Sequence, residues 1–159
     1  MMRNFQFSII GALFALIGIG MTVWGIGILK DAKASTSWPT VQGEITGSRI
    51  DKSTSRDSDG HTDTTYRADV TYRYAVEDAE YTGDTVSFGE YGSDRRSHAD
   101  RIVKRYPVGK EVKVHYDPEK PEKAVLEPGV TWSSYLVLGM GLFFTGGGLA
   151  FCYSRRWRA

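Results

Sequence analysis

The chain has few residues that could cross-link it or bind a metal. Its 159 residues include one cysteine, Cys152, in the second apolar segment, so the middle of the chain has no disulfide and no cysteine-based metal site. The three histidines, His61, His98 and His115, show no spacing typical of zinc ligands. Between its apolar ends the chain has about 100 residues, which is enough to build a hydrophobic core without disulfides or bound metals.

Charge is absent from two long segments. Residues 7–29 and 132–153 contain no charged side chain. Residues 30–127 hold all 19 acidic residues but 16 of the 20 basic ones, so 16 positive against 19 negative charges give a net charge of −3. A nucleic-acid-binding surface normally needs a concentrated basic face, so the composition predicts no nucleic-acid partner.

The motifs of common catalytic sites are also missing. No serine lies in a Gly-x-Ser-x-Gly sequence, and Gly146-Gly147-Gly148 lacks the Lys and Ser/Thr of a phosphate-binding loop. Asp57-x-Asp59 could open a calcium loop, but Gly60 comes too early and Ala68 stands where the bidentate Glu should be. We therefore expect a protein without enzymatic activity, metal or cofactor.

Both uncharged segments have the length of membrane-spanning helices. At about 1.5 Å per residue, residues 7–29 and 132–153 each cross a bilayer core of roughly 30 Å. Ala32-Lys33-Ala34 resembles a signal cleavage site, so removal of the first segment is the alternative. The apolar run of residues 7–29 is longer than the roughly 7–15 residues usual for a signal peptide, which favours a retained helix. The sequence therefore predicts a hairpin of two transmembrane helices.

Basic residues at the C-terminus indicate the orientation of this hairpin. Arg155, Arg156 and Arg158 follow the second apolar segment within a basic tail, residues 154–159. Such residues tend to stay in the cytoplasm. We expect an integral protein of the cytoplasmic (inner) membrane, with the lipid bilayer as a partner, both termini cytoplasmic and residues 31–130 extracytoplasmic.

Glycines recur every seven residues in both apolar segments. The repeats are Gly11/Gly18/Gly25, Gly20/Gly27, Gly139/Gly146 and Gly141/Gly148. Glycine is common in transmembrane helices, but a stripe of small residues also lets two helices approach closely in lipid. We predict helix packing through Gly11, Gly18, Gly25, Gly139 and Gly146, either within the hairpin or against another membrane protein.

The segment between the helices, residues 38–129, has the pattern of a small, mostly-β domain. Alternating residues predict strands, and one i, i+3, i+4, i+7 stripe predicts a helix over 93–106. The expected strands are 41–50, 66–77, 81–88, 112–117 and 124–127. We expect Gly83 to form a β-bulge and residues 51–63 to form a flexible polar connection. About five antiparallel strands and one helix fit a partly open barrel or a sandwich.

Tyrosines and charged residues fall on opposite faces of this domain. Six tyrosines occupy expected inward positions: Tyr66, Tyr72, Tyr74, Tyr81, Tyr106 and Tyr116. They predict an aromatic core, with a groove for a partner strand or peptide as the alternative. The expected partner surface consists of Arg67, Asp69, Arg73, Asp57 and Asp59.

Several short motifs of the middle segment resemble one known family. They are Trp38-Pro39, Gly43, Ile45, the Tyr72/Tyr74 strand, Tyr81-x-Gly83, Phe88-Gly89, Tyr106-Pro107-x-Gly109, Val112-x-Val114-x-Tyr116-Asp117-Pro118 and Ala124-x-Leu126-x-Pro128-Gly129. Together they resemble, over residues 38–129, a widespread bacterial family known only as a domain of unknown function. The resemblance implies a small β module next to one or two transmembrane helices. It brings no catalytic or ligand-binding residues.

Three hypotheses about function follow. The first is a non-enzymatic integral membrane protein whose extracytoplasmic β domain binds another protein or an envelope component. The second is a structural accessory subunit of a larger membrane complex, held through its helices. The third is a membrane-bound immunity or stress protein that neutralises a toxin. We expect a protein partner in addition to the lipid bilayer.

Overall fold

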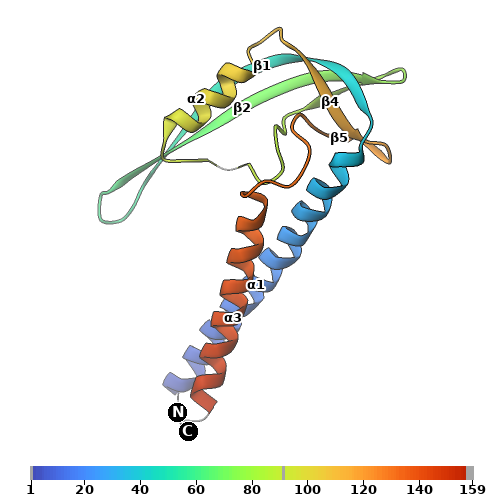
Figure 1. Ribbon diagram of the computed structural model, residues 1–159. Coiled ribbons are helices and arrows are strands. Elements are labelled where there is room, and N and C mark those ends of the chain that lie inside the picture. The colour runs from blue at the N-terminus through green and yellow to red at the C-terminus, as the bar shows by residue number, and fades with distance from the viewer. Residues whose placement is uncertain (1, 91, 157–159) are drawn as a thin grey trace.

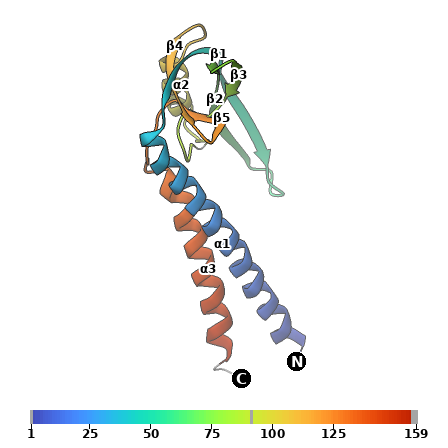
Figure 2. The ribbon, with the colours of Figure 1, turned by 90° about the vertical axis from the view of Figure 1, so that its right-hand side faces the viewer.

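The computed structural model describes residues 2–90 and 92–156. Two long helices, α1 (Met2–Ala34) and α3 (Ser134–Arg156), lie side by side, and a small β domain sits at one end of the pair (Figure 1; Figure 2). A short 3₁₀ helix, η1 (Ser35–Ser37), connects α1 to the first strand. The start of α1 and the end of α3 lie at the opposite end of the helix pair from the β domain (Figure 1).

The two apolar segments are helical, but only one has the properties of a membrane span. Within the described residues, Gly11–Ser37 is long and apolar enough to cross a membrane. A signal sequence has the same properties, and this helix lies near the N-terminus. The apolar part of α3, Ser134–Ala150, is shorter. Length and composition therefore support one of the two predicted transmembrane helices. In the expected basic tail, residues 154–156 continue α3 and residues 157–159 lie outside the described residues.

Five antiparallel strands form one open sheet in the order β3-β2-β1-β4-β5. They are β1 (Thr40–Arg56), β2 (Thr62–Val76), β3 (Ala79–Gly83), β4 (Glu111–Asp117) and β5 (Lys120–Val125). Tyr74 of β2 donates a hydrogen bond to the carbonyl of Pro121 in β5 (2.6 Å), so the sheet is curled. The predicted strand number is confirmed. The sandwich alternative is wrong because there is a single sheet, and that sheet leaves β3 and β5 as its edges.

Residues 51–63 are not a flexible connection. β1 and β2 stay paired as far as Arg56 opposite Thr62 and form a long ribbon (Figure 1). Its turn is closed by Asp57, whose Oδ1 accepts hydrogen bonds from the N–H groups of Asp59 (3.1 Å) and His61 (2.8 Å). The sequence pattern did not predict these strand ends, because nearly all their residues are exposed and a strand without a buried face shows no apolar alternation.

The strand expected over residues 81–88 ends at Gly83, and Gly83 does not form a bulge. Gly83 pairs with Tyr72 and lies against its ring, where a Cβ would come within 2.6 Å of ring carbons. The glycine is therefore required for a close approach. The register of the sheet shifts instead between Ile45 and Gly47.

The helix α2 (Arg96–Arg105) packs against β2 and closes one side of the core. Its Ala99 is fully buried, and Ile102 and Val103 pack against the same cluster. The aromatic core predicted from the sequence is confirmed: three of the six tyrosines are buried and three are partly buried against them, namely Tyr72, Tyr74 and Tyr106, and Tyr66, Tyr81 and Tyr116.

Candidate functional site

Buried hydroxyl groups attach the β domain to the helix pair. Ser35 of η1 and Ser134 at the start of α3 are both fully buried. The N–H of Gly129 donates to Ser35 Oγ (3.0 Å), and Ser134 Oγ donates to the carbonyl of Phe88 (2.8 Å). Gly89 has a φ of 82° and packs so tightly on Ser134 that a Cβ would lie 2.7 Å from the Ser134 Cα. This junction holds the loop after β3 and the segment before α3 directly against the end of the helix pair.

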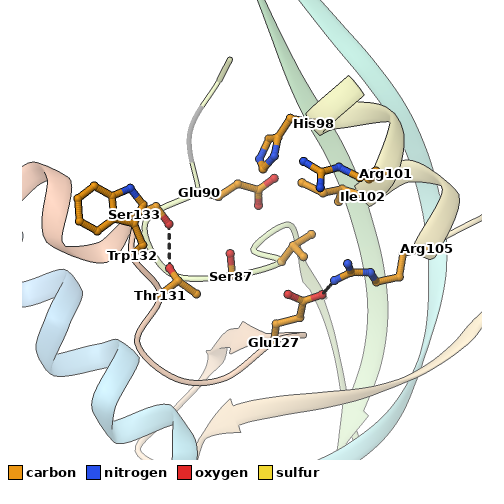
Figure 3. Close-up of a pocket in the computed structure, with 11 residues that line it drawn as sticks. Ser87, Glu90, His98, Arg101, Ile102, Arg105, Glu127, Thr131, Trp132 and Ser133 are labelled. Atoms are coloured by element: carbon orange, nitrogen blue, oxygen red, sulfur yellow. Dashed lines mark hydrogen bonds and ion pairs between the residues drawn. The ribbon is translucent and has the colours of Figure 1, made fainter. Parts of the chain in front are cut away.

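A cleft of about 290 Å³ lies between α2 and this junction (Figure 3). Three segments that are far apart in the sequence line it: the loop after β3, α2, and the segment that enters α3. Their polar and aromatic side chains in the cleft are Ser87 and Glu90, then His98, Arg101 and Arg105, then Glu127, Thr131, Trp132 and Ser133. The cleft therefore combines charged, hydroxyl and aromatic groups.

The carboxyl group of Glu90 is the most unusual group in the cleft. Its Oε1 is buried and has no hydrogen-bond partner among the described residues. Burial raises the pKa of Glu90 above the ordinary value for glutamate, although the positive charge of Arg67 and hydrogen bonds from the backbone of Val86 and Ser87 lower it. A buried acceptor without a partner is costly, so a ligand that donates a hydrogen bond there would be stabilised.

Arg105 and Glu127 neutralise each other at the opposite side of the cleft. They form an ion pair, and the hydroxyl of Tyr106 donates a hydrogen bond to the same Glu127 oxygen (2.8 Å). Burial, followed by the hydrogen bond to Glu127, raises the pKa of Tyr106 to about 12. This cluster is satisfied within the protein and needs no ligand.

Arg101 differs from Arg105 because its charge has no acidic partner among the described residues. Its Nε donates to the carbonyl of Ser97 (3.3 Å), and the rest of the guanidinium faces the cleft opposite Glu90 (Figure 3). No ion pair joins Arg101 to Glu90 within the part of the chain that the structure describes. Apart from the Arg105–Glu127 ion pair, the cleft thus presents the guanidinium of Arg101 and the carboxyl group of Glu90 on facing walls, with His98 also among its lining residues (Figure 3).

The cleft holds side chains of the types that nucleophilic and metal sites use. Ser87 and His98 enter the cleft from different walls (Figure 3). No group of three His, Cys, Asp or Glu side chains that could hold a metal ion occurs among the described residues. The cleft is suited to binding a small polar group through charge and hydrogen bonds.

The partner surface predicted from the sequence lies elsewhere. Arg67 and Arg73 are exposed on β2, and the half-buried Asp69 beside them forms an ion pair with Arg49 (2.5 Å). Asp57 and Asp59 form the turn of the β1–β2 ribbon. None of these five residues lines the cleft.

The predicted glycine stripes divide between two faces of the helix pair. Gly18 and Gly25 pack against α3, and the carbonyl of Gly11 lies close to Gly148. Gly139 and Gly146 meet no atom within 4 Å among the described residues. These two glycines therefore face away from α1 and do not pack within the hairpin, whereas their packing against another membrane protein, the other alternative, stays a prediction.

The other glycine repeat of α3 makes the contact with α1. A Cβ on Gly141 would lie 2.6 Å from the backbone nitrogen of Thr22, and a Cβ on Gly148 would lie 2.7 Å from that of Ala15. Both repeats have the same spacing and the same residue type, so the sequence offered no means of choosing between them.

Sequence reasoning also missed Glu90, Arg101 and Ser133 as members of one site. No local motif connects them, because they belong to a loop, a helix and a helix entrance. Trp132 carried the only signal, since an aromatic residue at the end of an apolar helix is typical of a membrane interface.

Comparison with known proteins agrees with the resemblance found in the sequence. No curated protein matches the chain. A family model described as "Domain of unknown function (DUF3592)" matches residues 41–131. The match includes all five strands, except the first residue of β1, as well as α2 and the residues that line the cleft, except Trp132 and Ser133. The chain therefore belongs to the DUF3592 family of domains of unknown function.

Proposed function

We propose that this is a non-enzymatic membrane protein whose β domain binds an envelope component at the bilayer surface. The observation that carries the proposal is the position of the cleft. It lies where the β domain meets the apolar helix pair and is lined by Trp132, which is 76% exposed. An exposed tryptophan at the end of an apolar helix favours the level of lipid headgroups.

Apolar side chains on the outward faces of both helices support a membrane hairpin. Leu16 and Ile17 of α1 are 65% and 58% exposed, and Leu142 and Phe143 of α3 are 57% and 76% exposed. Lipid chains would cover such surfaces, which are costly to expose to water. The apolar part of α3, Ser134–Ala150, is shorter than that of α1, so the second membrane crossing is part of this proposal.

Contacts between α1 and the β domain support retention of α1 over cleavage as a signal sequence. Asp31 forms an ion pair with Lys123 of β5 (2.5 Å), and Ala32 is fully buried. Ser35 of η1, which accepts the hydrogen bond from Gly129, donates its own hydroxyl to the carbonyl of Ala32 in α1 (2.8 Å). Removal of α1 would break these contacts and expose the base of the β domain.

The proposed orientation has both termini in the cytoplasm and residues 31–130 outside. Two single-cysteine variants test it in a Cys152→Ser background, with Ser58→Cys in the exposed ribbon turn and a cysteine added after Ala159. A membrane-impermeant maleimide applied to intact spheroplasts should label only the first variant. Labelling of the second variant alone would overturn the orientation, and release of the protein from membranes by salt washing would overturn the anchor.

Photo-crosslinking tests the binding site itself. A photoactivatable phenylalanine analogue at Trp132 should form adducts with an envelope component. The same analogue at Val108, which is 62% exposed but does not line the cleft, should not. Equal adducts at both positions, or none at Trp132, would contradict a binding site in the cleft.

A second candidate is an accessory subunit of a larger membrane complex. It is favoured by Gly139 and Gly146, which leave room for close approach of another helix on the face that α1 does not cover. Gly146→Leu should leave the α1–α3 pair intact but release any subunit that co-purifies in mild detergent. Retention of the same subunits by Gly146→Leu and Gly139→Leu variants would argue against this candidate.

A further inference from the structure

We infer that the cleft recognises a phospholipid headgroup carrying both a phosphate and a primary ammonium, with Arg101 facing the phosphate and Glu90 facing the ammonium. The inference rests on the proposed function, because it requires the cleft to lie at the bilayer surface. It goes further than the proposed function because it names the class of ligand and the side chain that binds each charged group of the ligand.

The charge pattern of the cleft favours a ligand with two opposite charges. Arg105 and Glu127 form an internal ion pair, whereas neither Arg101 nor Glu90 forms an ion pair among the described residues. Glu90 is half-buried and is acted on by the positive charge of Arg67, which lies outside the cleft, and Arg101 is exposed. An anion bound at Arg101 alone would lie close to the carboxyl group of Glu90, and a cation bound at Glu90 alone would lie close to the guanidinium of Arg101. A zwitterion places an opposite charge beside each of the two groups.

The direction of the two side chains matches such a ligand. Figure 3 shows Glu90 reaching into the cleft from the loop and Arg101 reaching in from α2 on the facing wall. A guanidinium presents several N–H donors to phosphate oxygens, and an ammonium presents three donors to a carboxylate. The buried Oε1 of Glu90, which lacks a hydrogen-bond partner within the described residues, would gain one.

The size of the cleft and its surroundings favour a headgroup over a larger ligand. Its volume of about 290 Å³ lies at the lower end of ligand sites, which span roughly 300–1,000 Å³. Ser133 adds a hydroxyl at the start of α3, and Trp132 beside it is exposed. The headgroup would therefore occupy the cleft while its acyl chains continue along the apolar surface of α3.

The test uses the full-length protein in detergent with three short-chain lipids as probes: phosphatidylethanolamine, phosphatidylcholine and phosphatidylglycerol. The choline group has no N–H to donate, and phosphatidylglycerol has the phosphate without an ammonium. Binding is measured by native mass spectrometry and by the shift in melting temperature. The wild type should bind phosphatidylethanolamine about tenfold more tightly than either of the other lipids, the equivalent of one strong hydrogen bond in free energy.

Three variants assign the roles. Glu90→Gln should abolish the preference for phosphatidylethanolamine, and Arg101→Gln should weaken binding of all three lipids. Lys104→Gln, on the same helix but outside the cleft, should bind like the wild type. Far-ultraviolet circular dichroism checks that each variant is folded.

The outcomes separate this inference from the proposed function. Equal binding of the three lipids by wild type, or a preference that survives both Glu90→Gln and Arg101→Gln, overturns the zwitterion site. If Trp132 still crosslinks an envelope component in cells, the proposed function stands and only the ligand class is wrong. A preference for phosphatidylglycerol would assign the cleft to an anionic lipid, and that result also overturns the inference.

Discussion

Gly18 of α1 and Thr145 of α3 interlock with a second pair, Thr22 and Gly141. A Cβ on Gly18 would lie 2.5 Å from Thr145 Oγ1, and a Cβ on Gly141 would lie 2.6 Å from Thr22 Oγ1. Each threonine hydroxyl donates a 2.8 Å hydrogen bond to the carbonyl of the glycine four residues earlier in its own helix. The two helices therefore meet through a reciprocal pattern of glycine and threonine that fixes their rotation.

This contact predicts a difference between two neighbouring glycines of α1. Gly18→Leu should lower the free energy of unfolding in detergent by about 1–3 kcal/mol, because the added side chain overlaps with α3. Gly20→Leu should have little effect, since a Cβ on Gly20 meets no atom within 4 Å in the described part of the chain. Denaturant titration measures both. An equal effect of the two substitutions would mean that the helices do not pack as described.

The close approach of Gly83 to Tyr72 predicts an intolerant position in the β domain. Gly83→Ala should cost about 1–3 kcal/mol of stability, because its methyl group would come within 2.6 Å of the Tyr72 ring, which is fully buried. Gly47→Ala is the matched control, since its Cβ would lie 3.5 Å from Thr71, an ordinary contact. A destabilised Gly47→Ala with an unchanged Gly83→Ala would contradict the packing of β2.

The junction between α1 and the β domain can be tested with two adjacent hydroxyl residues. Ser35→Ala leaves the N–H of Gly129 without its acceptor in a partly buried position and should cost about 1–3 kcal/mol. Thr36→Ala removes an exposed hydrogen bond to the carbonyl of Lys33 and should change stability little. Limited proteolysis between α1 and β1 gives a second measurement. Faster cleavage is expected only in Ser35→Ala.

Glu90 predicts a pH-dependent term in stability. Its pKa is raised in the folded protein, so the folded state binds more protons than the unfolded state between the two pKa values. Stability from this group should therefore be greatest below the unfolded pKa and should fall as pH rises through the folded pKa. In Glu90→Gln that fall should be absent. Unfolding free energies of wild type and variant between about pH 4 and pH 8 measure the difference, which isolates the contribution of Glu90 from that of the other ionisable groups.

A wild-type curve parallel to that of Glu90→Gln over the whole range would show that the carboxyl group is not perturbed. A curve that rises with pH relative to the variant would have the opposite sign. That outcome would mean that Glu90 is stabilised in its charged form, by an ion pair with Arg101 or another cation.

The sequence alone determined the parts of the fold that local patterns encode. Tyr72 and Tyr74 alternate with polar residues because one face of β2 is buried, and Ala99 and Ile102 follow helical spacing because one face of α2 is buried. The apolar composition and the length of the segments at both ends predicted helices, and both segments are helical. Wherever burial repeats with the period of an element, the sequence displays that element.

Only the tertiary structure decided the rest. The exposed ends of the β1–β2 ribbon have no buried face and therefore show no apolar alternation in the sequence. Whether Gly141 or Gly139 contacts α1 depends on the rotation of α3 about its axis, and the contacts of α3 with Thr22 and the junction at Ser134 set this rotation. The cleft joins Glu90, Arg101 and Trp132 from three separate segments. Such a site arises from contacts between residues distant in the chain, and no periodicity within any one segment can encode them.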